Sequence, residues 1–489
     1  MNKNMFWHSL NIEMKLLRRR GTWSSFVLIV ILIGLATWIG QQEKNSIQDS
    51  VLQVIGEEAQ EKREFTAQLD SIERGLKPDA NPRFSPKNPY SLVFSSKAYA
   101  IKKMPALTVL SIGENDLFSH AAEVTSFDYN RISQSEIGNP EAQRYGYFDL
   151  AFFFTILLPL LIIGYNYDII SGERETGRLS LIFVQSANSV RWLFTKLAIR
   201  FSVLFAITWC GTIAFLLLLT DTPIDFSFFI FTCFLIAYIV FWLLLATLSN
   251  LFIGKSTNNA FALVVYWLAV VVVLPMTTSM LSEALFPTPS RLLYVTTYRD
   301  AVSHAEKINR DSLVNTYFTD HPELAAHKSS ASISDEWKTN FQFFKWVLAY
   351  GETVASDVRP LRTQFNDQRN AQEIVARKLA ALSPSQQMHD GLQHLAGSSA
   401  FHHHQFQKQM FDFIEQQWLP WLHERIFKEQ QLTVTDLKSR PEFSYEPPGM
   451  SYTYWSLTFL ILYNIVLLMA LFAAIGLKLR PISVLQTNL

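Results

Sequence analysis

Six long apolar stretches constrain this chain more than any other feature of its sequence. Each approaches or exceeds the ~20 apolar residues that an α-helix needs to cross ~30 Å of hydrocarbon. Charged residues make up only 17% of the 489 residues, whereas a soluble domain has roughly 25%. The sequence therefore predicts an all-α integral membrane protein with six transmembrane helices, at residues 23–40, 150–167, 201–220, 228–253, 261–281 and 454–477.

The first stretch has two possible interpretations. Basic residues precede its apolar core, as they do in a signal peptide. However, the leader is long, and the far end reads Thr37-Trp38-Ile39-Gly40, which is a poor cleavage site. Trp23 and Trp38 bracket the core, as interfacial aromatic residues do. We therefore expect an uncleaved transmembrane helix.

The distribution of positive charge predicts the orientation of the helices. Basic residues lie before the first stretch and between the second and third, whereas the link between the third and fourth, residues 221–225, carries only acids. By the positive-inside rule, both termini and the segment 168–200 are cytoplasmic. The two long insertions, 41–149 and 282–452, are then extracytoplasmic. The basic residues are Lys3, Lys15, Arg18, Arg19 and Arg20, then Arg174, Arg178, Arg191, Lys196 and Arg200.

Two smaller features concern the membrane. Phe6, Leu10, Met14 and Leu17 recur at helical spacing among basic residues, which predicts a cytoplasmic amphipathic helix over residues 1–22. Pro275 should kink the fifth transmembrane helix, because proline has no backbone N–H.

Both insertions carry enough aromatic residues for a packed core, and we interpret them as two mainly helical folded domains. In the first, residues 42–75 have a helical pattern, whereas residues 90–94 and 107–112 have an extended one. In the second, helices are expected near residues 290–309, 334–352, 364–382 and 401–427.

A histidine cluster in the second insertion raises the question of a metal site, because imidazole is a common metal ligand. Consecutive histidines point to different faces of a helix, however, and no HExxH spacing occurs. We therefore interpret the cluster as a solvated polar face, with no metal and no catalytic residues. Its members are His389, His394, His402, His403 and His404.

The segment between the second and third stretches carries the most distinctive pattern. It combines a charged helix start, a glycine break at Gly177, an apolar strip and a polar turn, after which Ser189 begins an amphipathic lead-in to the next span. Such a segment is suited to docking a partner on the inner face of the membrane, although an ordinary charged loop explains the composition equally well.

This segment resembles the signature loop of type-2 ABC exporter permeases, an acidic "GERE-x-G-x-L" run followed by an Arg and a Lys that enter the next helix. Glu173, Glu175, Gly177, Leu179, Arg191 and Lys196 match, whereas Ala187 stands where a proline is usual. The resemblance extends weakly over most of the chain, to a bacterial subfamily with large extracytoplasmic insertions; among its marks are Asn139-Pro140-Glu141 and Leu382-Ser383-Pro384.

The resemblance implies a permease subunit in the bacterial inner membrane, driven by a separate ABC ATPase. ATP and Mg would then bind in the partner chain, and a second permease, identical or related, would complete the transport path. The residues expected to contact the ATPase are Glu173, Arg174, Glu175, Gly177, Arg178, Leu179, Leu181, Phe183, Arg191 and Lys196.

The chain itself lacks a nucleotide-binding motif. Gly254-Lys255-Ser256 resembles the end of a Walker A loop, but the motif requires glycine where Ser249 stands. No long run of basic residues suggests a nucleic-acid partner.

Two other functions remain open. A secondary transporter usually carries ionisable groups inside the membrane, and the third to sixth stretches contain none. A non-transporting signal or mechanical transducer would use the same loop to pass ATPase motion to the insertions. The transported substrate is not readable from the sequence.

Overall fold

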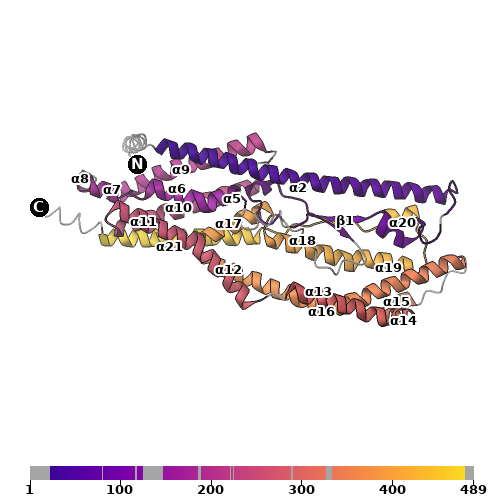
Figure 1. Cartoon of the computed structure of the whole chain (residues 1–489). Helices are drawn as coiled ribbons and strands as arrows, with labels where there is room; N and C mark the ends of the chain where they lie inside the picture. The colour runs from indigo at the N-terminus through magenta and orange to yellow at the C-terminus, as the bar shows by residue number, and fades with distance from the viewer. Residues whose placement is uncertain are drawn as a thin grey trace.

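The computed structural model describes residues 22–79, 81–115, 118–124, 147–185, 189–220, 222–223, 225–287, 290–325 and 333–478. Within these ranges the chain is almost entirely helical, and six helices are long and apolar enough to span a membrane. Both findings confirm the predicted class of protein (Figure 1). The amphipathic helix expected over residues 1–22 lies outside the described residues, except for the last one.

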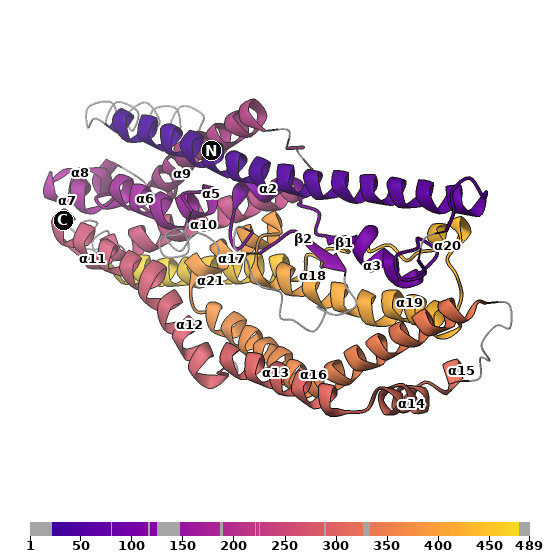
Figure 2. The ribbon, with the colours of Figure 1, turned by 45° about the vertical axis from the view of Figure 1, so that its right-hand side comes forward.

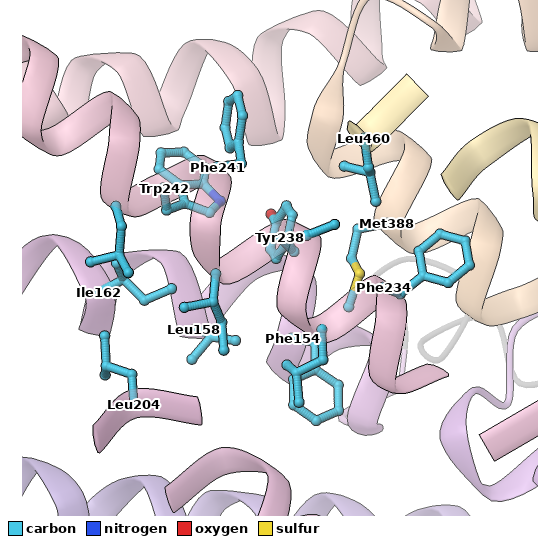
Figure 3. Close-up of a cluster of buried hydrophobic side chains, with 14 of the residues drawn as sticks. Phe154, Leu158, Ile162, Leu204, Phe234, Tyr238, Phe241, Trp242, Met388 and Leu460 are labelled. Carbon is cyan, nitrogen blue, oxygen red and sulfur yellow. The ribbon is translucent and has the colours of Figure 1, made fainter. Parts of the chain in front are cut away.

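The six spans form a bundle around helix α10. They are the first part of α2 (Thr22–Glu73), α5–α6 (Leu150–Phe152 and Leu158–Asn166), α9 (Ser189–Leu219), α10 (Phe226–Phe252), α11–α12 (Ser256–Leu268 and Leu274–Leu285) and α21 (Ser451–Lys478). Helix α10 packs against α6, α9, α11 and α21. Its Tyr238 and Trp242 are fully buried at the centre of the apolar core (Figure 3).

Two of the spans contain a π-helical turn. Phe153–Leu157 joins α5 to α6, and Ala269–Val273 joins α11 to α12. In each span a proline, Pro159 or Pro275, follows the π-helical turn within two residues. A π-turn beside a proline is a common cause of helix distortion, because proline leaves one carbonyl without its usual donor. The structure therefore places an irregular turn where we predicted the kink in the fifth span.

Helix α2 is much longer than the span predicted at residues 23–40. The span and the charged helical stretch after it form one continuous helix, about 78 Å long at 1.5 Å per residue. The sequence between residues 24 and 77 contains no proline, so nothing breaks the helix at the membrane boundary. Gly40 allows α2 to lie close to the first insertion, because a Cβ at Gly40 would lie 2.6 Å from the backbone oxygen of Val109.

Both insertions lie at the same end of the bundle, opposite the short helices α7 (Ser171–Glu175) and α8 (Arg178–Gln185) (Figures 1 and 2). We call these the insertion end and the loop end. The described chain begins and finishes at the loop end, at Thr22 and Lys478.

The first insertion is less extended than predicted. Residues 90–94 and 107–112 fall largely in the helical turns η1 (Pro89–Ser91), α3 (Leu92–Ser95) and η2 (Ala106–Leu110), so the extended interpretation was wrong. The side chain of Asn88 caps the first turn by accepting a hydrogen bond from the Tyr90 N–H, and Pro89 favours a helical start. The antiparallel strands are instead β1 (Ala98–Ile101) and β2 (Ala121–Val124), with Ala98 opposite Val124.

The second insertion is helical, as predicted, but one long helix stands in place of two of the predicted helices. Residues 334–352 and 364–382 belong mostly to the single helix α16 (Asp335–Ala380), which continues through Pro360. The other helices are α13 (Arg291–Lys307), α14 (Arg310–Asp320), α15 (Pro322–Ala325), α17 (Pro384–Ala396), α18 (Ala400–Phe413), α19 (Leu419–Phe427) and α20 (Val434–Lys438). A π-turn, Ile414–Trp418, joins α18 to α19.

The two insertions share their apolar cores, so they pack together as one unit, which we call the insertion unit. Tyr90 of the first insertion stacks on Phe344 of the second, with 4.3 Å between ring centroids. The Leu432 N–H donates to the Lys87 carbonyl over 2.7 Å. Phe65 of α2 is buried in a cluster that also contains Leu432.

The interpretation of the histidine cluster as a solvated polar face was wrong. His402 and His403 are only 7% and 4% exposed. The Ser399 hydroxyl lies 2.8 Å from Nδ1 of His402, and the ring of His403 stacks on Phe118. The cluster is buried because α18 packs against residues of the first insertion. Among the described residues, no group of three or more His, Cys, Asp or Glu side chains is placed to hold a metal ion.

Candidate functional site

The segment singled out by sequence forms a compact structure at the loop end. Helix α6 ends at Asn166, a turn leads into α7, and α7 ends at the Thr176–Gly177 turn before α8. Gly177 has φ of +71°, in the left-handed region that favours glycine. The glycine break expected from the sequence is therefore present.

Glu173 lies at the centre of a buried ion-pair network. One carboxylate oxygen accepts a hydrogen bond from Lys196 Nζ at 2.9 Å, and the other lies 2.9 Å from Arg178 Nε. The Glu173 and Lys196 side chains are only 11% and 6% exposed. Buried charges of this kind require their partners, because desolvation leaves an unpaired charge very unfavourable. Glu173 and Lys196 thus join α7 to α9 and are not available to a docking partner.

A second basic residue of α9 holds the end of the second span. The Arg200 guanidinium donates to the Tyr165 carbonyl over 2.7 Å and lies 4.0 Å from the Asp168 carboxylate. It also lies over the Tyr165 ring, 5.1 Å from the centroid. Arg200 therefore fixes the turn between α6 and α7.

Asn250, near the end of α10, fixes the start of α7. Its side-chain oxygen accepts from the Ile170 and Ser171 N–H groups and from the Ser171 hydroxyl, at 2.9–3.3 Å. Its amide donates to the Tyr167 carbonyl over 3.0 Å and to the Ala246 carbonyl over 2.9 Å. Because Asn250 is fully buried, these bonds form in a low-dielectric environment, where losing them is costly.

Glu175 connects the segment to the start of α11. Its carboxylate accepts from the Ser256 N–H at 2.7 Å and from the Ser256 hydroxyl at 3.0 Å. A carboxylate at a helix N-terminus satisfies a free backbone N–H and interacts favourably with the helix dipole. The link between the fourth and fifth spans, predicted at residues 228–253 and 261–281, is only residues 253–255 long, and Asn258 and Asn259 belong to α11.

The outer surface of the segment forms a continuous exposed ridge. We call it the docking ridge; it consists of Arg174, Glu175, Thr176, Gly177, Arg178 and Ser180, all of which are exposed. Arg191, on α9, is exposed as well.

Leu179 does not belong to the ridge. It is only 8% exposed and lies in the apolar core of the bundle, so the structure places it inside the chain and not on the surface. Its place on the inward side of the amphipathic helix α8 explains the burial. Leu181 and Phe183 follow in the same helix, but their side chains lie outside the described residues.

Sequence reasoning missed Asn250, Asn259 and Ser256, which complete the site from other spans. The Asn259 amide donates to the Tyr167 carbonyl, and the Ser249 hydroxyl donates to the Asn259 side-chain oxygen over 2.6 Å. A signal was available for Asn250, because it lies inside the apolar run 228–253, where a polar side chain is costly. Their partners, however, lie about 80 residues away in the sequence.

The docking ridge carries charged groups of both signs on a backbone held by four spans. Such a surface suits charge-assisted contacts with another protein. The residues within it do not form an arrangement of nucleophile, base and orienting group.

Comparisons with known proteins give one match. A family model described as "Domain of unknown function (DUF3526)" matches residues 291–446, from α13 to beyond α20 in the second insertion. No curated protein and no solved structure matches the chain.

Proposed function

We propose that this chain is the transmembrane permease subunit of an ABC exporter of the bacterial inner membrane, and that a separate ATPase drives it through the docking ridge. One observation carries the proposal. The ridge is exposed, yet residues 165–175, which run from the end of α6 into the ridge, are bonded to α9, α10 and α11 through Lys196, Arg200, Asn250 and Ser256. A force applied there would reach α6, α9, α10 and α11 together.

The remaining parts of the complex follow from this assignment. ATP and Mg would bind in the ATPase subunit, and this chain would have no enzymatic activity. Only 11% of the most apolar window of α11–α12 is buried inside the chain, against 67% for α10. The exposed face of α11–α12 would therefore contact lipid or a second permease chain. The loop end would be cytoplasmic and the insertion end extracytoplasmic.

A mechanical transducer is the second candidate, and the shape of α2 favours it. The helix continues without a break from the bundle into the insertion unit. A continuous helix transmits displacement along its axis, so the same ATPase could move the insertions without transporting a substrate.

A test of the docking ridge requires an exposed charge that lies outside the buried ion-pair network. Reversing the charge of Glu173 would place a second positive charge beside the buried Lys196 and would disturb folding, so Glu173→Lys cannot isolate docking. Arg174 is exposed on the ridge and suits the purpose better. The matched control is Lys307→Glu, an exposed charge reversal on α13 in the second insertion.

The experiment places the photoreactive amino acid p-benzoylphenylalanine at Arg174, or at Lys307, in the full-length chain in native membranes. We expect position 174 to cross-link a polypeptide that azido-ATP also labels, and position 307 not to. Arg174→Glu should lower the ATPase activity that co-purifies with the chain at least fivefold, whereas Lys307→Glu should leave it unchanged. Equal activity in the two variants, without an ATP-binding cross-link at 174, would refute docking at the ridge.

A further inference from the structure

A cavity of about 690 Å³ lies in the insertion unit, beside the part of α2 that has left the bundle. It is lined by α2, by β1 with the residues that follow this strand, and by residues 440–445 after α20. Figure 2 shows β1 alongside α2 at this place. The volume is within the range of small-molecule binding sites. The docking ridge lies at the opposite end of the molecule, so the cavity is separate from it.

The middle of the cavity is apolar. Leu52 and Ile55 of α2 line it and are 54% and 41% exposed, although both lie beyond the predicted span. The same cavity is lined by Ile101, Met104 and Phe443, which come from both insertions. Exposed apolar side chains that gather in a concave surface mark a site for an apolar ligand. The middle of the cavity is therefore suited to a hydrocarbon chain.

Basic residues lie at the end of the cavity that is nearest the bundle. Lys44 follows Gly40, the predicted end of the first span, by about 6 Å along the helix. The chain after β1 returns to the same level, where Lys44 Nζ donates to the Ala106 carbonyl over 3.4 Å. Lys103, three residues before Ala106, is exposed and lines the cavity. This end thus carries two positive charges at the level of the lipid headgroups.

The acidic residues of the lining lie at the other end, about 21–27 Å along α2 from Lys44. There Glu58 pairs with Arg440 over 3.5 Å, and Glu442 pairs with Lys62 over 2.5 Å. Because each acid has a basic partner, the far end adds no net negative charge. The cavity is therefore positive near the membrane and close to neutral away from it.

The edge of β1 that faces α2 carries backbone donors. In an antiparallel pair, alternate residues direct their N–H groups away from the partner strand. The Lys97 N–H donates to the Glu61 carboxylate over 3.1 Å, and the Tyr99 N–H faces the Glu58 carboxylate. Two acids of α2, one helical turn apart, thus satisfy two donors of this edge.

Ile101 comes next in this alternation, and its N–H points to the same side. The turn of α2 that precedes Glu58 carries Val54 and Ile55, whose side chains cannot accept a hydrogen bond. The Ile101 N–H therefore requires an acceptor from elsewhere. An extended peptide added to this edge would need several donors in succession. One donor beside two ammonium groups suits a carboxylate instead.

We propose that the cavity binds a long-chain fatty acid from the adjacent membrane leaflet. The hydrocarbon chain lies along Leu52 and Ile55, and the carboxylate lies between Lys44, Lys103 and the Ile101 N–H, where it accepts charge-assisted hydrogen bonds. The site belongs to this chain alone and does not require an ATPase. Its test is therefore independent of the test of the docking ridge.

Fluorescence displacement tests the proposal on the full chain in phosphatidylcholine nanodiscs. The probe is dansylaminoundecanoic acid, whose emission rises in apolar surroundings, and empty nanodiscs give the signal of probe dissolved in lipid. We expect saturable binding above that background and displacement by palmitate. Hexadecanol and hexadecyltrimethylammonium carry the same chain with a neutral or a positive headgroup, and they should displace the probe at least about tenfold less well. Absence of saturable binding, or equal displacement by all three compounds, would overturn the proposal.

One substitution should block the cavity without disturbing the fold. Ile55→Glu repeats the arrangement of Glu58 one turn earlier, so the new carboxylate accepts from the Ile101 N–H in place of the ligand. Gln53→Glu is the matched control, at an exposed position of α2 outside the lining. We expect Ile55→Glu to weaken probe binding at least about tenfold without lowering the thermal unfolding midpoint, and Gln53→Glu to change neither. Equal binding by the two variants would place the probe elsewhere and refute this site.

Reversing one charge tests the headgroup end of the cavity. Lys103→Glu should reduce the preference for palmitate over hexadecyltrimethylammonium at least about tenfold, because the new carboxylate repels an anion and attracts a cation. Lys438→Glu, an exposed reversal on α20 outside the lining, should keep the preference. A preference that Lys103→Glu leaves unchanged would show that this end does not hold the carboxylate.

Discussion

At the scale of single residues, a few polar side chains at the ends of apolar helices organise the loop end. Asn250 accepts three hydrogen bonds from the start of α7 and donates to the end of the second span. Water cannot replace these partners at a fully buried position. The shape of the docking ridge therefore depends on an amide in a different span.

Replacing Asn250 with Leu should destabilise the loop end without preventing membrane insertion. The Ile170 and Ser171 N–H groups would lose their acceptor, at a cost of about 1–3 kcal/mol for each buried unpaired group. We expect a lower thermal unfolding midpoint and faster tryptic cleavage at Arg174 and Arg178. Asn258→Leu is the control, because Asn258 is exposed one helical turn into α11. Identical cleavage rates for the two variants would contradict the role of Asn250.

The residues of the ridge illustrate what local sequence can predict about a site. The charged run, the Gly177 turn and the start of α9 at Ser189 were all visible in the sequence, because they depend on local propensities. The burial of Glu173 and Leu179 was not visible in the sequence. It depends on contacts with α9 and with the bundle core, which a local pattern does not describe. Charge alone does not distinguish a partner contact from an internal ion pair.

At the scale of elements, the spans were predictable and their boundaries were not. Apolar length identifies a helix that crosses a membrane, but a helix may continue into water when no breaker intervenes, as α2 does beyond Gly40. The position of α17 was also unpredictable. It is short and carries Gln386, Gln387, His389 and Asp390, so its hydropathy is that of a soluble helix. Only contacts with distant spans place it in the apolar core of the bundle.

The continuity of α2 beyond the bundle leads to a prediction at Gly56. A Cβ at this position would meet no other atom, so Gly56→Ala should stabilise the helix by about 0.5–1 kcal/mol. Gly56→Pro should destabilise it by about 3 kcal/mol, because proline removes a hydrogen bond and clashes with the preceding turn. Thermal unfolding of the purified chain measures both effects.

Gly56→Ala and Gly56→Pro also test whether α2 transmits force to the insertion unit, as a mechanical transducer requires. If α2 transmits force to the insertion unit, Gly56→Pro should uncouple that unit while the ATPase still binds at the docking ridge. Gly56→Ala controls for the loss of glycine itself. A proline variant whose outer unit responds to ATP like the unaltered chain would show that continuity of α2 is unnecessary.

At the scale of the whole molecule, the insertion unit depends on buried histidines where its two parts meet. Burial lowers the pKa of His402 to about 3 and that of His120, in the first insertion, to about 4. Lys102 adds to both shifts through charge repulsion. Burial also lowers the pKa of His403, which stacks between the two insertions on Phe118. The folded unit thus holds these rings in their neutral form.

Acidification should therefore weaken the insertion unit. In the unfolded chain each histidine has a pKa near 6.5, so the unfolded state binds protons first as the pH falls. The stabilising effect is complete above about pH 7 and is lost progressively from pH 6.5 downward, by about 2 kcal/mol for each buried histidine at pH 5. Thermal unfolding of the purified chain between pH 8 and pH 5 should show a falling midpoint.

The contribution of one ring to this pH dependence can be isolated at position 403. His403→Phe keeps an aromatic ring against Phe118 but removes the titrating group, so its midpoint should fall less steeply below pH 6.5 than that of the unaltered chain. His304→Phe is the control, since the His304 side chain is 60% exposed on α13. If His403→Phe and His304→Phe change the pH dependence of the unfolding midpoint equally, the response to acid is governed by surface charge and not by the buried contact between the insertions. If His403→Phe alone flattens it, the two insertions are held together by a contact that requires neutral histidine, as their shared core implies.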